Sequence, residues 1–169
     1  MKIEIGETLV YPHHGAVTIE DLTTRSVKGV DTRFMTLRVH TSELTIQLPV
    51  DNVELVGVRD VIDEAGVKAV YEVLTNEFTE EPGNWSRRYK ANQEKMASGS
   101  VYRVSEVVRD LWRRDQSKGV SAGEKRMLEK ARQILVSELA LAQSITDEEA
   151  SVLLLEVLRD VPIDEPATV

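Results

Sequence analysis

Hydrophobic residues in the first 57 positions recur in short, partly alternating runs. Four runs rich in β-branched and apolar residues predict strands at Leu9–Pro12, Ala16–Leu22, Arg33–Val39 and Leu44–Val50. Turn-forming residues lie between them, among them the pair Lys28-Gly29. Four or five strands in so few residues leave no room for a crossover helix, so a small β-barrel is predicted.

After Gly57 the spacing of apolar residues changes to the three- and four-residue steps of amphipathic helices. Asn84 can cap a helix that Gly99 ends. Ser121 with Glu124, and Thr146 with Glu149, match the capping box that opens a helix. The predicted helices run over Asp60–Leu74, Asn84–Ala97, Ser100–Gln116, Ser121–Ala142 and Thr146–Asp160.

These two patterns together predict an α+β protein of two domains. The β-barrel domain is expected over residues 1–57, and an all-α bundle of about five helices over residues 58–162. The last residues, 163–169, are expected to form a frayed tail.

Charge is distributed unevenly along the chain, which carries a net charge of −8. From Trp85 to Arg132 there are thirteen Lys or Arg and six Asp or Glu, a net of +7, so the remainder carries −8 − 7 = −15. Exposed charges more than about 8 Å apart barely interact at physiological salt. The basic tract can therefore attract a polyanion such as DNA while the rest of the chain repels it.

Several classes of protein are excluded or disfavoured by the sequence. The chain has no cysteine and no run of about 18 apolar residues, and its N-terminus lacks the apolar block of a secretory signal. A cytoplasmic protein without a membrane span is therefore expected. No dinucleotide-binding, phosphate-loop or zinc-protease motif is present, so neither an enzyme nor a cofactor is expected.

A metal site is not expected either. His13 and His14 are neighbours on a predicted turn, so their rings do not point toward one ion, and capping or packing within the turn explains them better. The carboxylate pairs Glu80-Glu81 and Glu148-Glu149 are expected to lie on solvated surfaces.

Trp85 stands at the start of a predicted helix with no apolar neighbour. Arg87, Arg88 and Lys90 follow it within one and a half turns. One interpretation is a ring that staples the start of the helix to a core. The other is a wedge for DNA, in which the cations hold phosphates and the ring presses on or between base steps. The polar setting favours the wedge.

The next helix carries candidates with a structural explanation. Trp112 continues the apolar stripe of Val101–Leu111, so it is interpreted as a core residue. Arg113 and Arg114 end this helix, where positive charge favours the helix macrodipole. That role explains them at least as well as contact with DNA.

The helix that begins at Ser121 offers two ways of contacting DNA. Lys125 and Arg126 lie in its first turns, where the macrodipole disfavours cations, and a bound phosphate would explain them. Lys125 is therefore a candidate DNA contact. The helix pair also fits a helix-turn-helix, although Arg132 and Gln133 come late for reading base edges. A sequence-specific repressor and a protein–protein adaptor, whose basic tract serves an acidic partner, both stay open as alternatives.

Several long strings resemble the CarD family of bacterial transcription regulators, in its actinobacterial form. They are GETLVYPHHGAVTIEDL, LTIQLPVDN, EEPGNWSRRYKAN, EVVRDLWRRDQSKG and VSAGEKRMLEKARQILVSELALA. The resemblance covers the chain from about Ile3 to Leu158, and the strings around NWSRRYKAN and SAGEKRML are its most specific parts.

The resemblance implies a Tudor-like barrel that binds the β subunit of RNA polymerase, in a domain type shared with transcription-repair coupling factor. It also implies a monomer whose helical domain contacts promoter DNA at the upstream edge of the bubble, without reading sequence. The tryptophan would wedge into the minor groove and stabilise the open promoter complex. By this resemblance the DNA-binding residues are Trp85, Arg87, Arg88, Lys90 and Lys125.

Two positions in the β-domain match arginines that the family uses against polymerase. Arg25 retains the first, whereas the second is Gln47 in this chain. Loss of one charge at the rim of an interface changes association rate and salt dependence more than docked geometry. Polymerase binding is therefore expected to persist but to be weaker or rebalanced.

Overall fold

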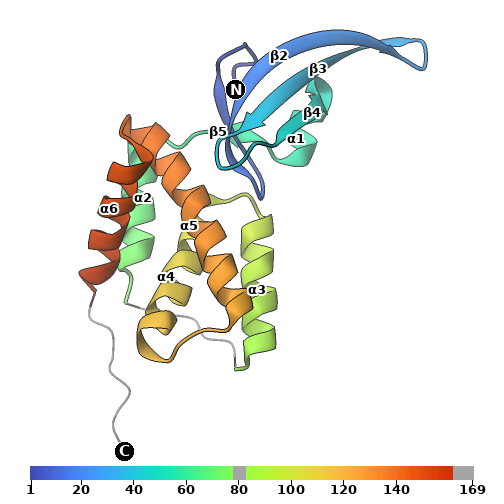
Figure 1. Cartoon of the computed structure of the whole chain (residues 1–169). Helices are drawn as coiled ribbons and strands as arrows, with labels where there is room; N and C mark the ends of the chain where they lie inside the picture. The colour runs from blue at the N-terminus through green and yellow to red at the C-terminus, as the bar shows by residue number, and fades with distance from the viewer. Residues whose placement is uncertain (78–82, 162–169) are drawn as a thin grey trace, which may run out of the picture.

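A five-stranded antiparallel sheet forms the N-terminal part of the chain (Figure 1). The structure, a computed structural model, describes residues 1–77 and 83–161. The strands follow the order β4-β3-β2-β1-β5 across the sheet. Their bounds are β1 Thr8–Tyr11, β2 Gly15–Val27, β3 Val30–Val39, β4 Thr45–Pro49 and β5 Arg59–Asp60.

The longest strands, β2 and β3, form a hairpin that reaches beyond the rest of the sheet (Figure 1). Val27 pairs with Val30 across a two-residue turn, and Lys28 and Gly29 both have positive φ, as the predicted turn requires. A register shift between Ile19 and Asp21 bends β2. One face of the sheet forms a core that includes Leu9, Val17, Ile19, Met35, Leu37 and Leu48.

Five helices follow, as predicted, and share a second apolar core. Each begins at a residue whose side chain accepts a hydrogen bond from the first turn. Their bounds are α2 Glu64–Thr75, α3 Trp85–Ala97, α4 Val101–Ser117, α5 Ala122–Gln143 and α6 Asp147–Arg159. In Figure 1, α3 lies at one side of the bundle, next to α5, while α2 and α6 lie at the other. The two-domain α+β class is thereby confirmed.

The two parts meet along α5 and at Gly99. Gly15, at the start of β2, packs so closely that an added Cβ would lie 3.3 Å from atoms of Ile134 and Ser137. Gly99 has φ +72 and ends the region of α3 as predicted, and an added Cβ there would lie 3.0 Å from Pro12. Both glycines thus allow a close approach between the domains.

The predicted start of the first helix is wrong. The helix expected from Asp60 begins at Glu64, because Arg59 and Asp60 pair with Val10 and Leu9 as β5. The sheet therefore continues past the expected boundary at residue 57. A short 3-10 segment (Val50–Asn52) and α1 (Val53–Val56), which the sequence pattern did not indicate, connect β4 to β5. The tail at 163–169 and the pair Glu80-Glu81 lie outside the described residues.

Candidate nucleic-acid interface

Trp85 occupies the first position of α3 and is 63% exposed. Asn84 caps the helix, since its side chain accepts a hydrogen bond from the backbone N–H of Arg87 at 2.9 Å. An indole ring that is mostly exposed is not buried as a staple against a core. The ring is instead open to a flat apolar or aromatic partner.

The three cations after Trp85 differ in their exposure to solvent. Arg87 and Lys90 are exposed. Arg88 is only 9% exposed and donates two hydrogen bonds to the carboxylate of Glu124, from Nη2 at 2.8 Å and from Nε at 3.3 Å. The expectation that Arg88 holds DNA does not fit this placement, because its charge is directed inward and already paired.

Glu124 also departs from its expected role. Its backbone N–H donates to the Oγ of Ser121 at 3.2 Å, which is one half of the predicted capping box. Its side chain, 1% exposed, pairs with Arg88 instead of returning to the backbone of Ser121. At Thr146 and Glu149, by contrast, both halves of the predicted box are present, at 3.1 and 2.9 Å.

The exposed cations of α5 lie on two sides of that helix. Arg126 and Lys130 line a hollow of about 330 Å³ together with Tyr89 and Gln93 of α3. Lys125 is exposed but lines a different hollow, beside Trp112 of α4. The fold therefore brings Arg126, more than Lys125, next to the helix of Trp85. The basic pair Lys125-Arg126 was visible in the sequence, but which member faces α3 was not.

Buried arginines of α4 donate hydrogen bonds to backbone carbonyls at the end of α2. Arg113 donates from Nη2 to the carbonyl of Leu74 at 3.1 Å, and Arg109 donates to the carbonyl of Val73 at 3.1 Å. Arg113 is buried, and this burial lowers the pKa of its guanidinium. Burial raises the pKa of Asp110, although the bond from Arg109 at 2.7 Å opposes that shift. Arg113 thus satisfies a carbonyl of α2, a role different from the one expected at the end of its own helix.

Trp112 is half-buried and packs against the core of the helical domain, which confirms its interpretation as a core residue.

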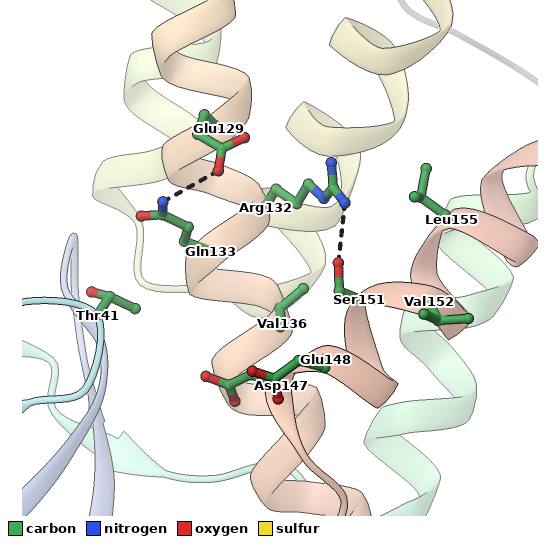
Figure 2. Close-up of a pocket in the computed structure, with 10 residues that line it drawn as sticks. All are labelled: Thr41, Glu129, Arg132, Gln133, Val136, Asp147, Glu148, Ser151, Val152 and Leu155. Carbon is green, nitrogen blue, oxygen red and sulfur yellow. Dashed lines mark hydrogen bonds between the residues drawn. The ribbon is translucent and has the colours of Figure 1, made fainter.

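A groove of about 560 Å³ lies between α5 and α6, and Thr41 of the β3–β4 connection lines one side of it (Figure 2). Acidic side chains line it at Glu129, Asp147 and Glu148. Arg132 donates to the hydroxyl of Ser151 at 3.0 Å, and Gln133 donates to Glu129 at 3.2 Å. Arg132 and Gln133, which come late in α5 for reading base edges, thus each donate a hydrogen bond within this groove.

Arg25 and Gln47 lie together on the outer face of the sheet. Nη2 of Arg25 donates to Oε1 of Gln47 at 3.4 Å, across β3. The guanidinium also lies over the ring of Phe34, 4.1 Å from its centroid. Both polar side chains are exposed, and β4, which carries Gln47, forms one edge of the sheet. This edge and face offer a surface for a protein partner.

The histidine turn packs as expected. The rings of His14 and Tyr11 meet edge to face, with centroids 5.5 Å apart. Burial, and then the nearby positive charge of Lys130, lower the pKa of His14. Over residues 1–77 and 83–161, no group of three or more metal-binding side chains comes together.

No helix in the described part of the chain is both long and apolar enough to cross a membrane.

Comparison with known proteins gives two family matches that cover most of the chain. The family model described as "CarD-like/TRCF RID domain" matches residues 3–62, and "CarD, C-terminal domain" matches residues 69–155. The chain is 31% identical over 146 residues to "Putative transcription factor YdeB" of Bacillus subtilis (strain 168). That alignment spans 86% of this chain and 95% of the relative.

A solved structure also matches the N-terminal part. It is the solution structure of the 72-residue N-terminal domain of Myxococcus xanthus CarD, with 25% identity and a TM-score of 0.31. The match covers 35% of this chain and 79% of that domain.

Proposed function

This chain belongs to the CarD family of transcription factors and carries its RNA polymerase-interacting domain type, and from this premise we propose how it acts. The N-terminal domain binds the β subunit of RNA polymerase. The helical domain holds promoter DNA at the upstream edge of the transcription bubble. There Trp85 enters the minor groove and stabilises the open promoter complex.

The exposure of Trp85 carries this proposal. The indole of Trp85 is 63% exposed at the first position of a capped helix. Because the helix already fixes the backbone of this residue, the side chain would lose little conformational freedom on binding DNA. Arg87 and Lys90 lie exposed within the first two turns of the same helix, where they can hold phosphates near the ring. Wedging a ring at a base step requires this combination.

Arg25 and Gln47 are the proposed contacts with polymerase. They belong to the β-domain, whereas Trp85 belongs to the helical domain, so binding to polymerase and binding to DNA use separate surfaces. The free edge at β4 allows a strand of the partner to extend the sheet.

The uneven distribution of charge along the chain supports the same division between polymerase binding and DNA binding. A protein that is already bound to polymerase needs little DNA affinity of its own, because tethering raises its effective concentration at the fork to roughly the millimolar range. The acidic remainder, which supplies Asp147 and Glu148 of the groove between α5 and α6, limits binding to bulk DNA. We therefore place the protein in the cytoplasm, at the nucleoid, as a monomer bound to polymerase.

The lifetime of the open complex tests this proposal. Preformed complexes of polymerase and promoter are challenged with a competitor that traps free polymerase, with wild-type protein or with Trp85→Ala. The wild type should prolong the lifetime. Trp85→Ala should remove most of that effect. If about 1–3 kcal/mol of stacking is lost, the lifetime with Trp85→Ala should be about fivefold or more shorter than with the wild type. Leu55→Ala is the matched control, since Leu55 is 86% exposed in the other domain.

Binding to polymerase is measured in parallel by co-purification. Trp85→Ala should bind polymerase as the wild type does, whereas Arg25→Glu should lose both binding and any effect on the promoter. If wild type and Trp85→Ala bind polymerase but leave the lifetime unchanged, the wedge is wrong and an adaptor role takes its place. Tight sequence-specific binding by the isolated protein would instead favour a repressor.

A further inference from the structure

The helix that presents Trp85 has few apolar anchors. Its buried residues are Arg88, Asn92 and Met96, one every four positions, so they form a single stripe. Met96 is the one apolar member and lies at the C-terminal end. In the N-terminal half, which carries Trp85, the two most deeply buried side chains are therefore polar, and the half-buried ring of Tyr89, beside Gly123 of α5, is the main apolar contact.

Arg88 supplies the anchor at that end. Two of its nitrogens bond the two oxygens of Glu124 at 2.8 and 3.3 Å, so the pair is bidentate and resists rotation. The side chains are 10% and 1% exposed, so water does not compete for them. Glu124 is itself held through its backbone bond to Ser121 at the start of α5.

We propose that the Arg88–Glu124 ion pair positions Trp85. Arg88 follows Trp85 by three residues, so one turn of α3 connects the buried guanidinium to the exposed ring. The pair fixes the start of α3 to the start of α5 and so keeps the ring pointed outward. It also fixes the position of Arg87 and Lys90 on α3 relative to Arg126 on α5. This inference rests on the proposed function of Trp85.

The same residues allow a rival account, in which Arg88 leaves Glu124 to hold a phosphate. The two accounts differ when both charges are removed together. A buried pair can often be replaced by apolar residues of similar volume without loss of stability, whereas removal of one partner leaves an uncompensated buried charge. The positioning account therefore predicts rescue in an apolar double variant, and the phosphate account predicts none.

Three variants make this test: Glu124→Gln, Arg88→Met, and the double variant Arg88→Met/Glu124→Met. Open-complex lifetime is measured with each, at a temperature where circular dichroism shows that the variant is folded. Both single variants should lose most of the effect on lifetime, as Trp85→Ala does. The double variant should recover it to near the wild-type value.

A second readout follows the ring directly. In a Trp112→Phe background, Trp85 is the sole tryptophan. Its fluorescence anisotropy should fall in each single variant and return in the double variant. Lys95→Gln is the matched control, because it breaks the 2.9 Å pair between Lys95 and Glu106 at the far end of the same helix. Anisotropy and lifetime should stay near wild type in that control.

The outcomes separate the two proposals. A double variant that regains anisotropy yet stays defective in lifetime would show that Arg88 contacts DNA, which overturns positioning. Unchanged anisotropy in folded single variants would overturn it as well. If Trp85→Ala itself leaves lifetime unchanged, the wedge function fails, and the positioning of the ring is then decided by anisotropy alone.

Discussion

Arg59 and Glu138 face each other across the junction of the two domains. Nη1 and Nη2 of Arg59 bond the two carboxylate oxygens at 2.6 and 2.9 Å, and Nε donates to the carbonyl of Gly99 at 3.0 Å. The carboxylate of Glu138, 1% exposed, also accepts from the backbone N–H of Ile62 at 3.1 Å. One ion pair thus ties β5, the segment after it, the α3–α4 connection and α5 together.

Loss of the Glu138 charge is predicted to destabilise the whole chain. Glu138→Gln leaves the guanidinium of Arg59 without its counter-ion. Breaking a fully buried pair costs about 3–5 kcal/mol, and the cost here should be smaller because 30% of the Arg59 side chain is exposed to water. Urea unfolding should show this as a lower free energy of unfolding. Arg38→Gln, which breaks the exposed pair with Glu20, is the control and should cost about 1 kcal/mol or less. Equal losses in the two variants would contradict a special role for the junction.

Lys90 and Arg87 are predicted to set the salt dependence of DNA binding. If each neutralises one phosphate, Lys90→Ala or Arg87→Ala lowers the slope of log K against log salt by about 1. Affinity should fall to a similar degree on unrelated DNA sequences. The check is a fluorescence titration over a salt series. Lys68→Ala is the control, since Lys68 is exposed on α2 at the other side of the bundle from α3 (Figure 1). An unchanged slope for Lys90→Ala would remove it from the interface.

Gln47→Arg is predicted to strengthen binding to polymerase. In this chain Gln47 accepts a hydrogen bond from Arg25, so an arginine there would replace an acceptor with a second exposed cation. An added rim charge changes association rate and salt dependence most, so the gain should appear as faster association that fades at high salt. Surface plasmon resonance with the isolated β-subunit domain measures it. Slower association would indicate that the partner surface is not acidic at this point.

Protonation of His14 is predicted to lower stability. Burial and Lys130 hold its pKa below the ordinary value of 6.5, so the unfolded chain takes up the proton first. The contribution of His14 to stability is therefore intact above pH 6.5 and is lost as the pH falls through the lowered pKa. Thermal unfolding between about pH 8 and pH 5 should show a smaller loss in His14→Gln than in wild type. His13→Asn removes only the smallest of the three causes that lower the pKa of His14, so it should keep most of the wild-type loss.

The helices and strands were determined largely by the sequence itself. Alternation in the first part and three- to four-residue spacing in the second predicted β1 to β4 and α2 to α6, since burial of one face requires those periods. Local chemistry fixed several ends, as at Asn84, Ser121 and Thr146, because a cap acts within one turn. The two-residue strand β5 is too short to produce a period, so the sequence did not reveal it.

Only the tertiary structure decided which individual charged side chains are buried and paired and which are exposed. Arg87, Arg88 and Lys90 look alike in sequence, yet Arg88 alone is buried, because Glu124 comes to it from a position 36 residues away. In the same way, Arg126 and not Lys125 faces α3, and Arg113 bonds a carbonyl of another helix. A cation's role depends on what the fold brings within hydrogen-bonding distance of it, and neither its residue type nor its local spacing carries that information.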